Sequence, residues 1–413
     1  LYVKSRLLQQ QGKNLVAPRL FYRGSLIAMV MAMFTKEMAI TLPFMILFYE
    51  TCFLKIKGGF NWKYLIPFFA AILIIPTMLM TKSVDFIGMR RALEEPSNIS
   101  SGQYFLTQFR VIVTYIRLLF IPINQNLDYY YPIAKNLFEL PILTSFIFLV
   151  SILTIAIKIF SRYRLISFGI FWFFITLLPE SSIIPIRDVI FEHRLYLPMV
   201  GFSLFLVSII YYIFANKNLK LMIILLFIIT SFYVILSYRR NFIWKDELTL
   251  WNDVVYKSPK KARPYLSLGK AYIEKGNIQQ AIFGSSKAIE INSNYAEAYY
   301  NRGLAYHQQG NFNQAISDYS RAIEIDPNYA DAYNNRGVAY NVQGNIQQGL
   351  SDFNRAIAIN SNLADAYNNR GVNYYLAKEY DKAWADVHKA EALGYTVNSR
   401  FLPALKQASG RDK

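Results

Sequence analysis

The sequence predicts an all-α protein in two parts, a polytopic membrane helical bundle over residues 1–240 and an α-solenoid of short repeats after it. Long runs rich in Ile, Leu, Phe and Val follow one another through the first part, and a fixed 34-residue period runs through the second. The first part holds 24 Lys and Arg against 10 Asp and Glu, whereas residues 241–413 hold 20 against 17. A basic excess in the apolar part is typical of loops beside membrane helices, so no nucleic-acid partner is expected.

Composition excludes several classes of protein. With 54% hydrophobic, 16% aromatic and 17% charged residues, the chain is not disordered. Its single cysteine, Cys52, excludes a disulfide framework and a cysteine-based metal site, and no metal ligands are predicted. No Walker, Rossmann, nucleophile-elbow or metalloprotease motif is present. The chain begins at Leu1 rather than Met without a signal-peptide pattern, so we expect an earlier part of the protein to precede it.

Most of the apolar runs are long enough to cross a hydrocarbon core of about 30 Å. The expected membrane helices lie at 64–80, 137–160, 165–179, 198–215 and 221–238. Basic residues flank 24–54 at both ends, which predicts a hairpin with its outer turn at Thr35-Lys36-Glu37. Segment 104–122 carries Arg110 and Arg117 on one helical face. It is therefore either a re-entrant or interfacial helix, or a spanning helix with its arginines turned inward.

Short basic loops predict the orientation of an integral, multi-pass membrane protein. Lys158, Arg162 and Arg164 lie in one loop and Lys217 and Lys220 in the next, which places both loops in the cytoplasm. Helix 221–238 then carries the repeats to the extracytoplasmic side. The basic pair at 239–240 opposes this orientation, but long domains translocate largely regardless of charge.

The second part repeats with a period of 34 residues at several independent positions. These are Gly269, Gly303, Gly337 and Gly371; Tyr265, Tyr299, Tyr333 and Tyr367; Tyr272, Tyr306, Tyr340 and Tyr374; and Ala288, Ala322, Ala356 and Ala390. This is the pattern of tetratricopeptide (TPR) repeats, each an antiparallel helix pair. Four repeats are expected at 262–295, 296–329, 330–363 and 364–397, with each Gly where the two helices pack closely. Residues 241–261 are expected to form a capping helix and linker, and 398–413 a C-terminal tail.

Ionisable residues in or beside membrane segments are candidates for function. Lys36 could hold a lipid-linked phosphate at the outer interface, or pair with Glu37 to close a helix turn. Asp128 could orient a sugar hydroxyl or a metal, and the tyrosines after it could stack on sugars or form an interfacial aromatic belt. His193 and Arg194 suit a phosphate or pyrophosphate group, or a structural ion network at a helix start.

A second candidate site lies in the repeats. Asn301, Asn335 and Asn369 hold the sixth position of successive repeats, and stacking would align them on the concave surface. An Asn side chain can pair with the N–H and the C=O of an extended peptide, so we expect these residues to bind a polypeptide. Asn is equally common there as a structural residue. The surrounding surface is polar and near neutral, which gives no charge preference for a partner.

Three membrane stretches and one helix carry a family resemblance. FTKEMAITLPF at 34–44, TQFRVIVTYIRLLFIPINQNLDYYYP at 107–132, EHRLYLPMVGF at 192–202 and WKDELTLW at 244–251 resemble the transmembrane and TPR repeat-containing protein O-mannosyltransferases and their bacterial relatives. The resemblance covers nearly the whole chain. It implies a GT-C-like bundle, truncated at its N-terminus here, with a catalytic site on the outer or lumenal face and a polyprenyl-phosphate-linked sugar as donor substrate rather than a bound cofactor.

The resemblance also limits what can be assigned. It implies a catalytic acidic residue just after the first membrane helix, in the part expected before Leu1, so no catalytic residue is named. The run Asp128-Tyr129-Tyr130-Tyr131 departs from the Asp-Tyr-Asp-Tyr form expected of the family, which weakens a metal-binding role for it.

Two functions from different classes follow. One is a membrane glycosyltransferase that transfers a sugar from a polyprenyl-phosphate donor to Ser or Thr of a polypeptide held by extracytoplasmic repeats, with Lys36 and Arg194 stabilising the departing phosphate. The other is a non-catalytic, membrane-anchored TPR scaffold for protein–protein interaction. Convergence of Lys36, Asp128, His193 and Arg194 on one outer cavity would favour the enzyme, and their scattering or pairing-off across the bundle would favour the scaffold.

Overall fold

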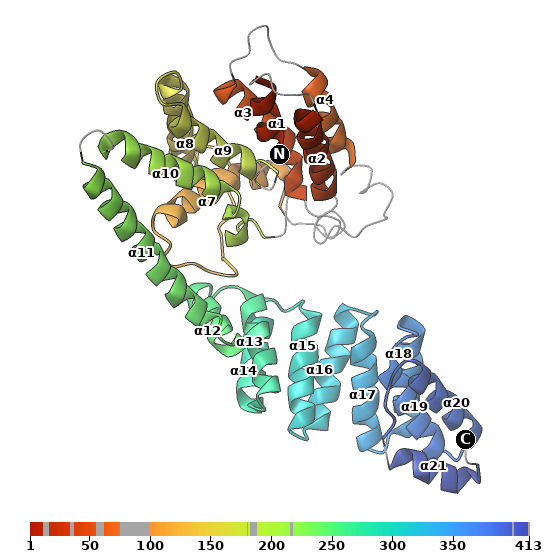
Figure 1. Cartoon of the computed structure of the whole chain (residues 1–413). Coiled ribbons are helices and arrows are strands. Elements are labelled where there is room, and N and C mark those ends of the chain that lie inside the picture. The colour runs from red at the N-terminus through yellow and green to blue at the C-terminus, as the bar shows by residue number, and fades with distance from the viewer. Residues whose placement is uncertain are drawn as a thin grey trace. The chain divides into compact units, whose positions relative to one another are not determined.

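A computed structural model describes residues 1–10, 16–33, 37–54, 62–74, 99–179, 181, 188–214, 218–398 and 400–411. These residues form helices joined by turns and loops, and no strand occurs among them. The chain divides into two compact units, Leu1–Arg240 and Asn241–Lys413 (Figure 1). The division falls where the apolar runs end and the repeats begin.

The first unit begins with a group of short helices. These are α1 (Tyr2–Gln10), α2 (Val16–Met33), the 3₁₀ helix η1 (Glu37–Thr41), α3 (Leu42–Phe53), α4 (Trp62–Ala70) and η2 (Ala71–Leu73). Tyr2, Met29, Leu65 and Phe68 bury their side chains together between α1, α2 and α4. Helix α1 was not expected, and α2 begins eight residues before the predicted hairpin.

Two of the N-terminal predictions cannot be followed in full. Thr35 and Lys36, in the expected outer turn, lie outside the described residues, and so does the side chain of Glu37. The expected span at 64–80 is described only as far as Ile74.

Five longer helices complete the first unit. They are α7 (Ser101–Phe120), α8 (Leu140–Ile159), α9 (Arg164–Leu177), α10 (Pro198–Phe214) and α11 (Leu219–Ile243). Helices α9 and α10 cross at Gly169 and Gly201, where a Cβ on Gly201 would lie 2.5 Å from the carbonyl oxygen of Gly169. Glycine at both positions therefore lets the two backbones touch.

Two helices of the described residues, α8 and α11, are long and apolar enough to cross a membrane. Their mean hydropathies are 2.5 and 2.6, and they bury little or none of their surface within the protein. Helices α9 and α10 are apolar but shorter. The Tyr233 hydroxyl of α11 donates to the carbonyl of Leu119, 2.6 Å away, and links α11 to the end of α7. Multi-pass topology and sidedness stay predictions.

Helix α7 covers the 104–122 segment and has one polar face. A capping box of Ser100 and Gln103 fixes its start. The Arg110 guanidinium lies 5.3 Å from the centre of the Tyr131 ring, whereas Arg117 is exposed. Thr107 is buried on the same helix and accepts a hydrogen bond from the Ala134 amide. Helix α7 thus holds the 126–134 loop through polar side chains, and it is not among the helices apolar enough to span.

The second unit is a stack of helix pairs behind one leading helix, α12 (Glu247–Lys257) (Figure 1). Asp246 caps α12 by accepting from the Thr249 amide at 2.9 Å. The pairs are α13 (Ala262–Glu274) with α14 (Ile278–Ile291), α15 (Ala296–Gln308) with α16 (Phe312–Ile325), α17 (Ala330–Val342) with α18 (Ile346–Ile359), and α19 (Ala364–Leu376) with α20 (Tyr380–Ala392). Each pair falls inside one of the four expected repeats.

The helix pairs of the repeats close in similar ways. A Cβ on Gly303 would lie 2.9 Å from the Tyr319 ring, and one on Gly337 would lie 2.7 Å from the Phe353 ring, so repeats 2 and 3 need glycine where their helices pack, whereas a Cβ on Gly371 of repeat 4 would make only ordinary contacts from 3.4 Å. The turn between the helices places one residue in the left-handed region, with φ 72° to 81° at Gly276, Gly310 and Gly344. The fourth repeat has Lys378 there, with φ 62°, which is strained for a residue with a side chain.

An arginine ladder joins neighbouring repeats. Arg302, Arg336 and Arg370 each bind the carboxylate of an Asp sixteen residues later, through two hydrogen bonds of 2.7 to 2.8 Å. Each also donates to a polar side chain of the repeat before it, and these acceptors are Ser286, Ser320 and Asn354. Every guanidinium therefore ties the two helices of its own repeat to the preceding one.

A further helix, α21 (Phe401–Ser409), stands where the sequence analysis expected only a C-terminal tail. Leu405 is fully buried against Trp384 and Val387 of α20. The Trp384 indole N–H donates to Ser409 at 3.0 Å. Helix α21 thus covers the apolar face that the last repeat would otherwise expose.

Candidate functional site

Two loops of the first unit meet beside α7. The Glu192 carboxylate accepts a hydrogen bond from the Asn126 amide at 2.6 Å and another from the Tyr129 hydroxyl at 2.7 Å. We call Asn126, Asp128, Tyr129, Glu192 and Arg194 the polar cluster. It joins the stretch that follows α7 to the stretch that precedes α10, more than sixty residues further along the chain.

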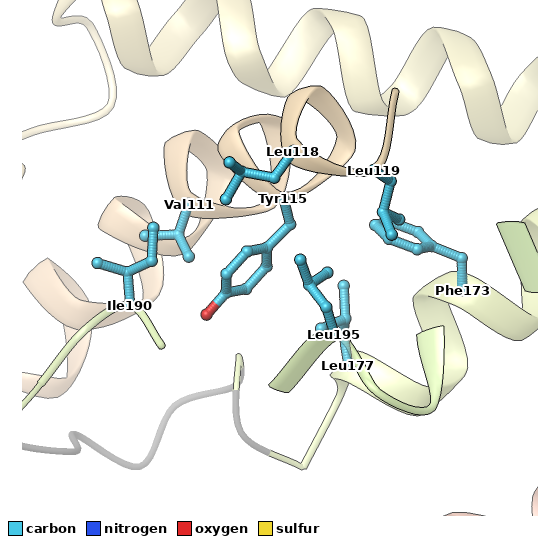
Figure 2. Close-up of a cluster of buried hydrophobic side chains, with 8 residues drawn as sticks. All are labelled: Val111, Tyr115, Leu118, Leu119, Phe173, Leu177, Ile190 and Leu195. Carbon is cyan, nitrogen blue, oxygen red and sulfur yellow. The ribbon is translucent and has the colours of Figure 1, made fainter. Parts of the chain in front are cut away.

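Helix α7 supplies the support beneath the polar cluster. The Tyr115 hydroxyl lies 2.9 Å from both backbone polar atoms of Phe191, accepting from the N–H and donating to the C=O. The Gln108 side chain donates to the carbonyl of Val189 at 3.2 Å. Figure 2 shows Tyr115 among Val111, Leu118, Leu119, Phe173, Leu177, Ile190 and Leu195. We call these eight buried side chains the apolar floor. Together with the hydrogen bonds of Tyr115 and Gln108, the apolar floor fixes the path of residues 189–195.

The buried members of the polar cluster carry opposite charges. Arg194 is only 2% exposed, and it donates to the carbonyls of Val189 at 3.3 Å and Asp188 at 3.1 Å. Asp128 is likewise 2% exposed, in a turn where its amide donates to the Asn126 side chain. A buried cation and a buried carboxylate therefore lie on two loops that Glu192 holds together.

The structure separates two residues that the sequence analysis treated as one phosphate-binding pair. His193 and Arg194 are neighbours on the short 3₁₀ helix η3 (Glu192–Leu195). Arg194 turns inward, whereas His193 is exposed, with its ring centre 4.9 Å from that of Phe191. Arg194 can therefore act from within the protein and His193 only at its surface.

Neither Tyr129 of the polar cluster nor Tyr131, two residues later, is acidic at neutral pH. Burial raises the pKa of Tyr129, the negative charge and hydrogen bond of Glu192 raise it further, and Arg117 partly opposes this. Burial also raises the pKa of Tyr131, against the hydrogen bond of Thr114 and the positive charge of Arg110. Both phenols stay protonated at neutral pH, so they can orient an oxygen-rich ligand without adding negative charge.

An apolar cavity of about 320 Å³ adjoins the floor of the polar cluster. Helices α7, α8, α9 and α10 line it, with Ile116, Phe148, Ile152, Phe174 and Phe202 among its walls. Leu119 and Phe173 belong both to this cavity and to the buried cluster under Tyr115. The cavity offers room for a hydrocarbon chain and no polar group for a sugar.

Metal ligands do not gather in the part of the chain that the structure describes. No group of three or more His, Cys, Asp and Glu side chains is placed to hold an ion among these residues. The polar cluster itself has only the two carboxylates of Asp128 and Glu192.

The asparagines of the repeats hydrogen-bond to one another across the stack. Asn368 donates to Asn369, Asn369 to Asn334, Asn334 to Asn335, and Asn335 to the Tyr300 hydroxyl, at distances of 2.8 to 3.5 Å. We call this the amide chain. Asn301 is buried at 4% exposure, while Asn335 and Asn369 are half-buried. Asn335 and Asn369, two of the three expected ladder positions, are therefore ordered by the protein itself.

Sequence reasoning missed Glu50, which is 2% exposed on the apolar helix α3. Its carboxylate accepts from the Tyr2 hydroxyl at 2.8 Å and from Arg6 at 2.5 and 3.1 Å. The signal was a single acidic residue within an apolar run. Its partners lie on α1, so Glu50 ties the first helix to the bundle.

Comparison with known proteins identifies the repeats. A model described as "TPR repeat" matches residues 269–310 and 303–344, and one described as "Tetratricopeptide repeat" matches 330–363. Over 187 residues the chain is 27% identical to a Caenorhabditis elegans protein named "Protein O-mannosyl-transferase F38B6.6". That match covers 44% of this chain and 26% of the relative, so the chain spans about a quarter of the relative's length.

Solved structures also resemble the chain over part of its length. Crystal structures of MamA include one that is 26% identical and covers 38% of this chain and 92% of its own, with a TM-score of 0.35. PilF of Pseudomonas aeruginosa is 19% identical over 43% of this chain and 81% of its own, with a TM-score of 0.37. The chain contains TPR repeats, and its resemblance to TPR-containing protein O-mannosyltransferases is confirmed by the curated relative.

Proposed function

We propose that this chain belongs to a membrane glycosyltransferase that moves a sugar from a polyprenyl-phosphate donor to Ser or Thr of a polypeptide held by its repeats. One observation carries the proposal. The polar cluster, with buried Arg194 and Asp128, rests on buried apolar side chains, two of which, Leu119 and Phe173, also line an apolar cavity, in a chain similar to a protein O-mannosyl-transferase. A lipid-linked sugar needs both an apolar site for its chain and a polar site for its head.

The apolar cavity suits the lipid chain of the donor, and the polar cluster suits its phosphate and sugar. The cavity between α7 and α10 is lined by apolar side chains, which favours a hydrocarbon chain. Arg194 adds a buried positive charge on the loop that the buried apolar side chains support, and a phosphate would be stabilised there by charge-assisted hydrogen bonds. Lys36 stays a further candidate for the phosphate. In this scheme Tyr129 and Glu192 orient sugar hydroxyls.

The acceptor side rests on the repeats, because TPR repeats imply polypeptide binding. We place them on the extracytoplasmic side, as the basic loops predict. The chain's single cysteine, Cys52, is buried and allows a clean test. Ser361→Cys in the exposed turn before repeat 4, combined with Cys52→Ser, should react with a membrane-impermeant maleimide from outside intact cells. Labelling only after lysis would place the repeats in the cytoplasm.

The activity test uses the complete product of the gene in membranes. Transfer of labelled sugar from a polyprenyl-phosphate donor to a Ser/Thr peptide is measured beside Arg194→Gln and Lys36→Ala. The matched control is Arg162→Gln, which makes the same change at an exposed position between α8 and α9. Arg194→Gln should abolish transfer while Arg162→Gln retains it, at equal protein levels and equal thermal stability. Full transfer by Arg194→Gln would remove the polar cluster from the mechanism.

One observation favours the non-catalytic scaffold. Tyr129 and Glu192 bind each other, and Arg194 binds the carbonyls of its own loop, as side chains that only hold a fold would do. A scaffold would show no transfer with any sugar donor, yet would capture polypeptides through its repeats. The same preparations distinguish the two functions.

A further inference from the structure

Acidic residues recur at the second position of the first helix in three successive repeats. They are Glu297, Asp331 and Asp365. Glu297 is paired with Lys270 of the first repeat. Asp331 and Asp365 are exposed, and among the residues that the structure describes neither carboxylate has an ion-pair or hydrogen-bond partner.

The negative charges of Asp331 and Asp365 both influence Tyr300, although the two residues belong to different repeats. Burial raises the pKa of Tyr300 to about 12, and the negative charges of Asp331 and Asp365 both contribute. Neighbouring side chains shield part of the exposed Asp331 and so raise the pKa of its carboxyl, and the charge of Asp365 adds to the effect. Asp331 and Asp365 also hold the same position in two neighbouring repeats, which the hydrogen bond from Asn369 to Asn334 brings together, so groups from repeats 2, 3 and 4 share one region of negative potential near Tyr300.

The amide chain runs through this region and fixes its geometry. Asn335 donates to the Tyr300 hydroxyl at 2.8 Å, and Asn369 donates to Asn334 at 3.0 Å. Each amide nitrogen carries two hydrogens, so Asn335 and Asn369 can give one to the stack and still offer one to a peptide carbonyl.

A second, independent observation indicates that a ligand completes the surface. Among the buried polar atoms without a hydrogen-bond partner within the described part of the chain are the Asn301 side-chain nitrogen and the Asn368 side-chain oxygen. Asn301 is 4% exposed and follows Tyr300, while Asn368 is 8% exposed and lies one helical turn after Asp365. Asn368 belongs to the amide chain, and Asn301 holds the same repeat position as Asn335 and Asn369. Leaving such groups unpaired is costly, so this donor and this acceptor suit a polar partner laid along the amide chain.

We propose that the first-helix face of repeats 2 to 4 binds an extended peptide segment with a Lys or Arg side chain, whose cation lies between the carboxylates of Asp331 and Asp365. The amide chain pairs with the peptide backbone, and the two carboxylates select the basic residue. This rests on the proposed function, since it defines which polypeptides the repeats hold. It differs from the expectation of a surface without charge preference.

The chemistry favours a basic side chain over other occupants. Two carboxylates that raise the pKa of their surroundings repel each other, and a cation between them relieves that repulsion. An acidic segment would meet like charge and be rejected. Since both carboxylates are exposed, the attraction should weaken as salt screens it.

The test uses the full chain in lipid nanodiscs without any sugar donor. Three fluorescent Ser/Thr-rich peptides, identical except for Lys, Gln or Glu at one central position, are titrated at low and high salt. The variants are Asp331→Asn, Asp365→Asn and the double variant. Asp381→Asn, on the second helix of repeat 4 and paired with Arg411, is the matched control. All substitutions keep side-chain shape, and helix content and thermal unfolding are recorded for each protein.

The Lys peptide should bind about tenfold more tightly than the Gln peptide, and the Glu peptide more weakly than both. Each single variant should reduce the preference for Lys several-fold, the double variant should abolish it, and Asp381→Asn should preserve it. Equal binding of all three peptides, or a preference that survives the double variant, would overturn the proposal. So would Lys-peptide binding that depends on a divalent cation and is lost in EDTA. Because no donor is present, absent sugar transfer leaves this result unchanged.

Discussion

The arginine ladder makes a quantitative prediction about how the repeats hold together. In repeat 3, Arg336 donates two hydrogen bonds of 2.8 Å to Asp352 and one of 2.9 Å to Ser320 of the preceding repeat. Asp352→Asn removes the charge and one acceptor while it keeps the side-chain volume. The Arg336 guanidinium then faces an uncharged side chain that offers one oxygen acceptor in place of two.

The magnitude follows from the burial of the pair. Side-chain exposure is 18% for Arg336 and 8% for Asp352. An exposed ion pair contributes roughly 0–1 kcal/mol, whereas removing one partner of a fully buried pair costs roughly 3–5 kcal/mol. For a pair about four-fifths buried, we expect Asp352→Asn to cost about 2 kcal/mol. In a unit of this size that lowers the Tm by about 4–8 °C.

The assay is urea and thermal unfolding of residues 241–413, a unit with its own core and with α12 and α21 covering its ends. Glu324→Gln is the control, because both side chains of its ion pair are exposed, Arg321 at 50% and Glu324 at 62%. It should cost at most about 0.5 kcal/mol. Arg336→Gln combined with Asp352→Asn completes a double-mutant cycle, which should give a coupling energy above about 1 kcal/mol.

Equal losses for Asp352→Asn and Glu324→Gln would refute the reasoning, since burial would then not decide the strength of the pair. A coupling energy near zero would refute it as well. In that case Arg336 would contribute through its contacts with Tyr333 and Tyr340 and not through the carboxylate.

Three further predictions follow from single positions. Lys378→Gly should stabilise residues 241–413 by about 1 kcal/mol in urea unfolding, because it removes a side chain from a left-handed turn; unchanged stability would mean that the turn is not strained. Gly201→Val should lower the melting temperature of the first unit in detergent, because its side chain would collide with Gly169, and an unchanged value would contradict the close crossing. Burial lowers the pKa of His307, so the repeats should lose stability as the pH falls below about 6.5, the ordinary pKa of histidine, and His307→Gln should reduce that loss; an identical pH profile for both proteins would be the contrary result.

The repeats could be predicted because their signal is local and periodic. Each Gly, Tyr and Ala position recurs every 34 residues, and every helix pair lies inside an expected repeat. Helices α1 and α21 could not be found in the same way. Their buried residues, such as Tyr2 and Leu405, pack against partners far along the chain and leave no periodic mark.

The candidate site could be predicted only as separate stretches. Asp128 and Arg194 were recognised as ionisable residues beside membrane segments, which is a local property. What joins their loops is Glu192 on one side and Tyr115 of α7 on the other, over separations of 66 and 76 residues. The opposite orientations of His193 and Arg194 likewise depend on how η3 meets the apolar floor.

Charge counting does not distinguish the paired charges of the repeats from the unpaired ones. Residues 241–413 hold 20 basic and 17 acidic residues, which suggested a surface without preference. Three of those cations, Arg302, Arg336 and Arg370, are each neutralised by a partly buried Asp within the stack. The carboxylates of Asp331 and Asp365 have no such partner within the described residues, so net charge and available charge differ. The ladder thus leaves the first-helix face negative in a nearly neutral unit, and Asp352→Asn should weaken folding without removing the preference for a basic peptide.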